Sequence, residues 1–141
     1  MKALIIGCGR VGSTIALNLH KEGWDVVVVD ENEDALSRLG ESWPGTFVVG
    51  HGMDTDLLRE AGIEEADAVV AATDGDNTNI VIGQVAQKRF DVPCVVVRLL
   101  DPGRAEFYTG RGMRVVCPTS TAIAALMDTV RTCEAPRVPV R

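Results

Sequence analysis

The stretch KALIIGCGRVGSTIALNLHKEGWDVVVVD, residues 2–30, decides the fold. Its apolar start at 2–6 is long enough for one buried β-strand, and a second apolar run at 26–29 predicts another. Between them, residues 13–21 are expected to form a helix, because apolar side chains recur on one face. Residues 7–12, which connect the first strand to this helix, have the pattern G-x-G-x-x-G.

The glycines of this turn have distinct physical roles. Gly7 permits a tight turn from strand to helix, Gly9 leaves room for a pyrophosphate beside the backbone, and Gly12 lets the helix pack closely on the strand. Free N–H groups at the helix start favour a phosphate there. We therefore predict a nucleotide site, although the same glycines would also serve helix–strand packing alone. The candidate nucleotide-binding residues of the loop are Gly7, Cys8, Gly9, Arg10, Val11 and Gly12.

A carboxylate stands at the end of the second predicted strand. Asp30 lies eighteen residues beyond Gly12, where it is placed to accept hydrogen bonds from ribose hydroxyls. A negative charge at this position repels a 2′-phosphate, so NADP is disfavoured. Asp30 and the adjacent Glu31 are both counted as candidate nucleotide-binding residues.

The composition fits one domain and argues against nucleic-acid binding. The chain has 141 residues, 46% of them hydrophobic, which is enough for a core. Its net charge of −6 is the wrong sign for a nucleic-acid partner. The charge is uneven, because residues 1–97 hold seven basic and sixteen acidic side chains, whereas residues 98–141 hold seven basic and four acidic. The basic end either meets an acidic partner or is a solvated surface.

The four cysteines show no C-x-x-C and no metal-ligand spacing, so no metal site is expected. Cys94 lies in an apolar run and is expected to be buried, and Cys8 is interpreted as a small loop residue instead of a nucleophile. The N-terminus runs directly into a strand, and no apolar run reaches the roughly 18 residues of a membrane span. We therefore expect a reduced, cytoplasmic protein.

Beyond residue 30 the chain continues to alternate strands with helices. Asp54 and Asp101 are expected to cap helices. This alternation predicts an α/β fold, a Rossmann-type doubly wound parallel sheet of six strands in the order 3-2-1-4-5-6, with the ligand at the carboxyl ends of strands 1 to 4. Strands are expected at 46–49, 66–72, 94–99 and 114–117, and helices at 31–40, 55–61, 76–90, 102–109 and from 118 onward.

The second half of the chain shows a more specific resemblance. The segments LLREAGI at 57–63, ADAVVAATD at 66–74 and GMRVVCP at 112–118, together with the glycine loop and Asp30, resemble the RCK or KTN (TrkA-N) domains of regulatory subunits of Trk/Ktr-type potassium uptake systems. The resemblance covers nearly the whole chain. It implies that residues 1–118 form the nucleotide-binding domain and that residues 119–141 form a C-terminal helix and tail.

This resemblance implies regulation without catalysis. Domains of this family bind NAD(H) or the adenine nucleotides ATP, ADP or AMP as a signal. They pair as homodimers, often assemble into higher rings, and gate a membrane potassium-translocating subunit. The protein is accordingly expected to be a cytoplasmic subunit, peripheral at the inner face of the cell membrane, with no nucleic-acid partner.

The resemblance also implies roles for residues at the ends of the third and fourth strands. Gly52 and Met53 are expected to line the adenine, and Thr73 and Asp74 to lie near the phosphates or the nearer ribose. The family usually has an acidic residue after the third-strand glycine, and this chain has His51 instead. That histidine is either a surface residue or a group that titrates near neutral pH.

Two arginines and two loop residues have alternative roles. Arg10 either reaches the phosphates or is a solvated residue at the helix start. Arg98 either adds positive charge near the phosphates or pairs with Asp101. Asp76 and Asn79 are interpreted as loop and helix caps in preference to ligand contacts.

The C-terminal part departs from the family in one position and offers one further surface. The family often has a Glu after the proline of the sixth strand, and this chain has Thr119, which argues against a metal-assisted triphosphate and favours NAD(H), AMP or ADP. The last helix either crosses to a second copy or packs on its own sheet. Its apolar stripe consists of Ile123, Leu126, Met127 and Val130.

Two rival functions remain beside the regulatory one. A small NAD-dependent oxidoreductase would need a proton donor and substrate-positioning groups. The chain has only His20 and His51 as histidines and no Tyr-x-x-x-Lys, so this function is disfavoured. A vestigial site is disfavoured by the intact glycines and Asp30.

Overall fold

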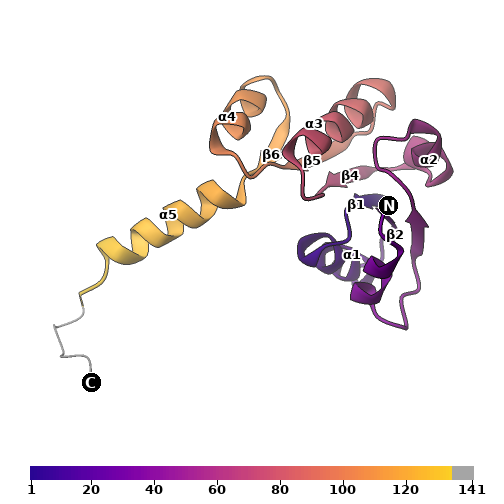
Figure 1. Ribbon diagram of the computed structural model, residues 1–141, viewed down its shortest axis with the longest axis horizontal. Coiled ribbons are helices and arrows are strands. Elements are labelled where there is room, and N and C mark those ends of the chain that lie inside the picture. The colour runs from indigo at the N-terminus through magenta and orange to yellow at the C-terminus, as the bar shows by residue number, and fades with distance from the viewer. Residues whose placement is uncertain (135–141) are drawn as a thin grey trace.

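The computed structural model describes residues 1–134 and consists of one parallel sheet with helices on both faces (Figure 1). The strands are β1 (Lys2–Ile6), β2 (Asp25–Asp30), β3 (Thr46–Val49), β4 (Ala68–Ala71), β5 (Cys94–Arg98) and β6 (Arg114–Val116). The helices are α1 (Arg10–Lys21), α2 (Thr55–Glu60), α3 (Asp76–Gln84), α4 (Pro102–Gly110) and α5 (Pro118–Arg131). Shorter 3₁₀ segments are η1 (Glu33–Leu39) and η2 (Ile63–Glu65), and a π-helical segment η3 (Val85–Arg89) continues α3.

The sheet has the strand order β3-β2-β1-β4-β5-β6 with every pairing parallel, which confirms the predicted fold. β1 lies in the middle, where Leu4 pairs with Val27 of β2 and with Val69 of β4. A strand buried on both faces needs apolar side chains at every position, and the unbroken β-branched runs supply them. The order reverses between β1 and β4, so a crevice forms at the carboxyl ends of these strands.

Alternate side chains of each strand enter two separate cores. Leu4 and Ile6 face α2, α3 and α4 in the larger core, whereas Ala3 and Ile5 face α1 and η1 in the smaller one. Strands β3, β2, β1 and β4 contribute side chains to the smaller core, and β5 and β6 contribute none. On the sheet face that α1 and η1 cover, the half formed by β5 and β6 therefore has little helical cover.

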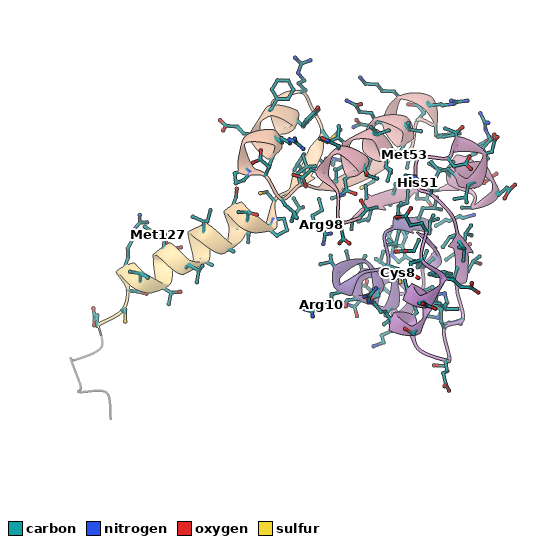
Figure 2. The ribbon with its side chains drawn as sticks, in the orientation of Figure 1. Cys8, Arg10, His51, Met53, Arg98 and Met127 are labelled. Carbon is teal, nitrogen blue, oxygen red and sulfur yellow. The ribbon has the colours of Figure 1, made fainter. Side chains whose placement is uncertain are left out.

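The helix α5 projects away from the sheet, with none of its residues buried (Figure 1). Its apolar stripe is exposed to solvent, and Figure 2 shows Met127 on the projecting helix. The alternative that this helix packs on its own sheet is therefore wrong for the chain as it stands alone. Of the expected segment 119–141, residues 135–141 lie outside the described residues.

Helix boundaries follow the caps that the sequence indicated, with three differences. Asp54 accepts hydrogen bonds from the N–H groups of Asp56 and Leu57, and Asp101 accepts one from Arg104, so both predicted caps are confirmed. The first helix begins at residue 10 instead of 13, because Gly9 already has the extended N-cap conformation. The segment expected as a helix at 31–40 is 3₁₀, and the helix expected at 76–90 changes to π geometry in its last turn.

Candidate nucleotide-binding site

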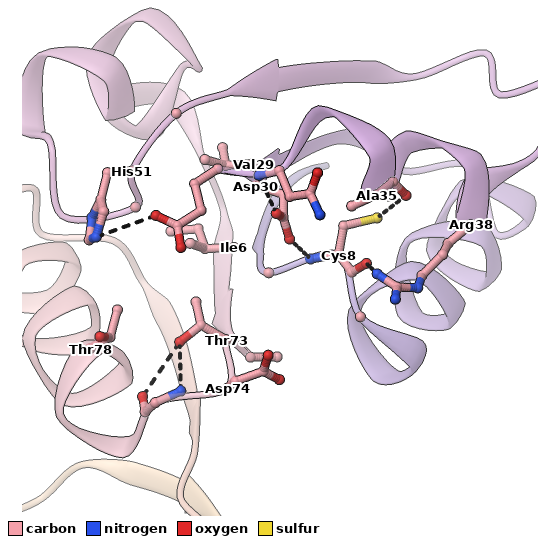
Figure 3. A pocket seen from close by; sticks show the side chains of 18 residues that line it. Ile6, Cys8, Val29, Asp30, Ala35, Arg38, His51, Thr73, Asp74 and Thr78 are labelled. Atoms are coloured by element: carbon pink, nitrogen blue, oxygen red, sulfur yellow. Dashed lines mark hydrogen bonds and ion pairs between the residues drawn. The ribbon is translucent and has the colours of Figure 1, made fainter.

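A cleft of about 420 Å³ opens at the carboxyl edge of the sheet (Figure 3). Loops after β1, β2, β3 and β4 form its walls, as expected for the point where the strand order reverses. The candidate residues that line it are Gly7, Cys8, Gly9, Asp30, Glu31, Gly52, Thr73 and Asp74. The candidate residues that do not line it are Arg10, Val11, Gly12, Met53 and Arg98.

The glycine turn leaves open space at one position only. Gly7 has a φ of +107°, and a Cβ added there would lie 2.5 Å from the carbonyl oxygen of Ala72. A Cβ on Gly12 would collide with the carbonyl oxygen of Gly7. In contrast, nothing lies within 4 Å of the place where a Cβ on Gly9 would be. Gly7 and Gly12 thus shape the turn, whereas the backbone at Gly9 borders open space.

The start of α1 borders this open space. Its N-cap Gly9 has no side chain to bond the first-turn N–H groups, and the first turn contains no acidic residue. These N–H groups and the positive end of the helix dipole are therefore available to an anion. Arg10 and Val11 are exposed at the same helix start, beside the cleft and not within its lining.

Asp30 joins the end of β2 to the glycine turn. Its Oδ2 accepts a hydrogen bond of 2.7 Å from the backbone N–H of Cys8, and its Oδ1 accepts one of 2.8 Å from Asn32. Each carboxylate oxygen has further lone pairs, so the group can also accept from a ribose hydroxyl. The residue predicted as a ribose contact is thus also a structural support of the loop.

Cys8 and Arg38 line the cleft on this side. The Cys8 thiol is buried and donates to the carbonyl oxygen of Ala35 at 3.3 Å. Burial, with a smaller contribution from the Asp30 carboxylate, raises the pKa of the Cys8 thiol above its ordinary value, which favours the protonated thiol over the nucleophilic thiolate. Arg38 donates from Nη1 to the Cys8 carbonyl oxygen at 3.1 Å and is the arginine of the lining.

Sequence reasoning missed Arg38. Its partner is a backbone carbonyl thirty positions earlier in the chain, and no side-chain pattern signals such a contact. The one feature of the sequence that could have pointed to Arg38 is its position shortly after Asp30, in the segment that forms η1.

Glu31 and His51 face each other across the mouth of the cleft. The His51 Nε2 lies 3.7 Å from Glu31 Oε2, and its Nδ1 accepts a hydrogen bond of 3.3 Å from the backbone N–H of Met53. This contact links the loop after β2 to the loop after β3 (Figure 3). The Met53 side chain is 40% exposed, so only the Gly52 half of the expected pair faces the cleft.

The loop after β4 is held by a buried amide. Asn79 is 1% exposed and forms hydrogen bonds with Thr73 and with the carbonyl oxygen of Arg98. Arg98 donates from Nη2 to the carbonyl oxygens of Thr73, at 2.8 Å, and Ala72. Asn79 thus supports the loop and does not line the cleft.

Arg98 forms no ion pair with Asp101, so the alternative pairing is wrong. Asp101 caps α4, and the acidic neighbour of Arg98 is Asp74, 4.0 Å away. Asp76, interpreted from the sequence as a loop or helix cap instead of a ligand contact, does not line the cleft. Its carboxylate accepts from the backbone N–H groups of Leu100 and Asp101, at 2.8 Å and 3.0 Å, and therefore ties two loops together.

The cleft has the chemistry of a binding site. It combines free helix N–H groups with hydrogen-bond acceptors at Asp30, Glu31 and Asp74.

Within residues 1–134, no group of three or more His, Cys, Asp or Glu residues is arranged to hold a metal ion. In the same part of the chain, no helix is both long and apolar enough to span a bilayer. Cys94, expected to be buried, is only half-buried.

The model of the TrkA-N domain family matches residues 3–118. The chain belongs to the TrkA-N domain family. A relative with the name Trk system potassium uptake protein TrkA, from Streptomyces coelicolor, is 47% identical over 116 residues. This match covers 82% of the chain and 52% of the relative, so the chain spans about half the length of that protein.

Solved structures share the fold of this TrkA-N domain at low sequence identity. The Kef C-terminal domain from Shewanella denitrificans, in its AMP-bound form, has a TM-score of 0.79 at 21% identity, and the match covers 96% of this chain and 83% of that one. The GsuK channel bound to NAD has a TM-score of 0.69 at 22% identity, and the match covers 82% of this chain and 21% of that one. Both confirm the fold of the TrkA-N domain.

Proposed function

We propose that this TrkA-N domain binds NAD(H) or an adenine nucleotide and acts as the nucleotide-sensing regulatory part of a potassium uptake system. The observation on which this depends is the open space over Gly9, bordered by the uncapped start of α1. A pyrophosphate there would meet free N–H groups, and the adjoining ribose would reach Asp30. Family membership and the nucleotides bound by Kef and GsuK support the same ligand class.

We propose that the bound nucleotide is read as a signal and is not consumed. The thiol in the cleft is held protonated by burial, and its proton points to Ala35. His51 lies at the mouth, bound to Glu31 and to the backbone of Met53, where it would be a poor proton donor to a substrate. A regulatory domain needs only a preference of the ligand for one of two conformations.

The partner surfaces of this proposal are α5 and the half-covered sheet face. We propose that α5 crosses to a second copy and forms a homodimer, and that dimers assemble further into a ring. The exposed apolar side chains of α5 and the weak cover of β5 and β6 support this. The ring would act on a membrane potassium-translocating subunit from the cytoplasmic face of the membrane.

The decisive experiment measures nucleotide-dependent thermal stability with NAD, NADH, ATP, ADP, AMP and NADP. A ligand at one hundred times its Kd is expected to stabilise the fold by about 2.7 kcal/mol. Gly9→Ala is expected to abolish this stabilisation while leaving the ligand-free domain folded, because the added methyl group meets only open space in the protein. Asp30→Ala is a less clean variant, since it also removes the bonds to Cys8 and Asn32.

Gly110→Ala is the matched control for Gly9→Ala. A Cβ there also has no neighbour within 4 Å, but it lies at the end of α4, outside the cleft. This variant is expected to keep the full response to nucleotide. An unchanged nucleotide response in Gly9→Ala, or turnover of NADH with a small carbonyl compound, would contradict the proposal.

A further inference from the structure

A second cavity, of about 280 Å³, lies between α4 and the segment formed by α3 and η3, helices that Figure 1 shows side by side. None of its lining residues also lines the nucleotide cleft. The segment begins with Asp76 after β4, on the cleft side, whereas it contributes to the cavity only from Gln84 onward. We call this second site the α3–α4 cavity.

The α3–α4 cavity is positively charged, although the chain as a whole has a net charge of −6. Among the described residues its charged lining side chains are Lys88 and Arg111, and no Asp or Glu lines it. Neither cation forms an ion pair within residues 1–134, where the basic partners are His51, Arg59 and Arg98. An ammonium and a guanidinium without a carboxylate partner keep their N–H donors for an anion.

Aromatic side chains form the wall on the α4 side. Phe107 is 52% exposed, and its ring centre lies 5.1 Å from that of Tyr108, with the two rings at 83° to each other. The Arg111 guanidinium lies 4.6 Å from the centre of the Phe107 ring, so a cation and an aromatic surface are held together. Met113 is 7% exposed and contributes the buried part of the lining. This wall suits a flat apolar group.

The opposite wall combines amides with an irregular helical turn. Gln84, Gln87 and Lys88 recur at spacings of three and four, so they share one face of the segment. In the same segment the N–H of Phe90 donates to the carbonyl oxygen of Val85, five positions earlier, which is a π turn. Such turns are rare and occur frequently at functional sites. The π turn is thus a second observation, independent of the charges, at this cavity.

We propose that the α3–α4 cavity is a second ligand site, which binds a small aromatic anion with a carboxylate or a phosphate as its charged group. The anionic group would lie between Lys88 and Arg111, and its ring would lie against Phe107 and Tyr108. The cavity volume is just below the usual range for drug-sized ligands, so a ligand of one ring fits best. This site does not depend on the nucleotide cleft or on the proposed function.

The test titrates the isotope-labelled chain with benzoate, phenyl phosphate, benzamide and acetate, and follows the backbone amide chemical shifts. Benzamide has the shape of benzoate without its charge, and acetate has the charge without the ring. We expect benzoate or phenyl phosphate to shift the amides of Lys88 and Arg111 with saturation, at a Kd on the order of 1 mM. Benzamide and acetate are expected to bind at least about fivefold more weakly. The tighter of the two aromatic anions identifies the charged group.

Lys88→Gln and Arg89→Gln form a matched pair of variants. Each removes one exposed positive charge from η3, but only Lys88 lines the cavity. We expect Lys88→Gln to raise the Kd of the aromatic anion about threefold and Arg89→Gln to leave it unchanged. Phe107→Leu keeps an apolar side chain but removes the ring, and it is expected to weaken binding by a similar factor.

Three results would overturn this inference: no saturable shift with either aromatic anion, equal affinity for benzamide, or equal effects of Lys88→Gln and Arg89→Gln. All of them leave the nucleotide response of the domain untouched, because the cleft shares no lining residue with the α3–α4 cavity. Conversely, a chain that does not respond to any nucleotide would still bind the aromatic anion.

Discussion

At the residue scale, a single side chain in the cleft can both support the loop and remain able to bind a ligand. Asp30 holds Cys8 and Asn32 while keeping lone pairs for a ligand, and Arg38 holds the other side of the Cys8 peptide. The glycine turn is therefore held in place by bonds within the protein itself. Such preorganisation lowers the entropy that binding would otherwise cost.

The Cys8 thiol gives a pH-dependent prediction. Burial, and then Asp30, raise its pKa in the folded protein above the ordinary value of 9.0, so the folded state binds this proton more tightly than the unfolded state. Its stabilisation is fully present below about pH 9 and is lost as the pH rises through the folded-state pKa. Cys8→Ala is expected to reduce the alkaline slope of the free energy of unfolding by at most about 1.4 kcal/mol per pH unit. Denaturant titrations between pH 8 and 10.5 measure this slope.

Cys133→Ala is the control for that series, because Cys133 is exposed. It is expected to keep the slope of the unaltered chain. If the Cys8→Ala slope is also unchanged, the thiol does not titrate differently in the folded and unfolded states.

Single residues were predictable where their task is set by local backbone geometry. Gly7 and Gly12 follow from a turn that tolerates no Cβ, and Asp30 from its place at a strand end. Arg38 was not predictable as a support, because its partner is a backbone group of a distant loop. Asn79 was expected to be a cap, but its bond to the carbonyl oxygen of Arg98 was not predictable, for the same reason. Side-chain patterns in a single sequence contain no signal for such contacts.

At the element scale, α5 is the unusual part of the molecule. A helix of 14 residues that buries nothing is marginal by itself in water. Ile123 is 52% exposed and Leu126 is 66% exposed, although the helix is amphipathic. A helix with an apolar stripe is stabilised mainly by packing, so we expect α5 to gain its stability in an assembly.

Leu126→Asp tests this assignment by placing a charge in the stripe. We expect the unaltered chain to be a dimer by size-exclusion chromatography with light scattering, and Leu126→Asp to be a monomer, because a buried unpaired carboxylate is costly. The domain should stay folded by circular dichroism, since Leu126 packs on nothing in residues 1–134. Thr121→Asp, on the opposite face of the helix, should remain a dimer, and a monomeric unaltered chain would contradict the assignment.

The regular elements were largely predictable, and their irregular ends were not. Unbroken β-branched runs marked the strands, and Asp54 and Asp101 marked two helix starts. The π geometry of Val85–Arg89 and the 3₁₀ geometry of Glu33–Leu39 depend on how each segment packs, so periodicity could not show them. The direction of α5 was left open, because an apolar stripe does not reveal which surface covers it.

At the scale of the whole molecule, hydrogen bonds connect the ligand edge to the base of α5. Asp76, at the start of α3, holds the backbone N–H groups of Leu100 and Asp101 after β5. The Leu100 carbonyl oxygen in turn lies 3.8 Å from the thiol of Cys117, the N-cap of α5. A movement of the loop after β4 therefore has a physical route to the projecting helix.

Asp76→Ala is expected to weaken this connection. Loss of two hydrogen bonds at a partly exposed site should cost about 1 kcal/mol of stability, while amide exchange at Leu100 and Asp101 becomes faster. Hydrogen-exchange measurements resolve these amides. Glu106→Ala, an exposed change on α4, should leave them as protected as before, and equal protection in Asp76→Ala would show that the carboxylate does not hold this loop.

The position of α5 has a mechanical consequence. The helix starts at the carboxyl edge of the sheet, where the cleft also opens. Once packing in an assembly stabilises it, its 14 residues form an arm of about 21 Å, at about 1.5 Å per residue. A tilt of about 10° at its base would displace its far end by about 3.6 Å. A small tilt at the carboxyl edge of the sheet would therefore move the far end of α5 by about the distance between two packed side chains.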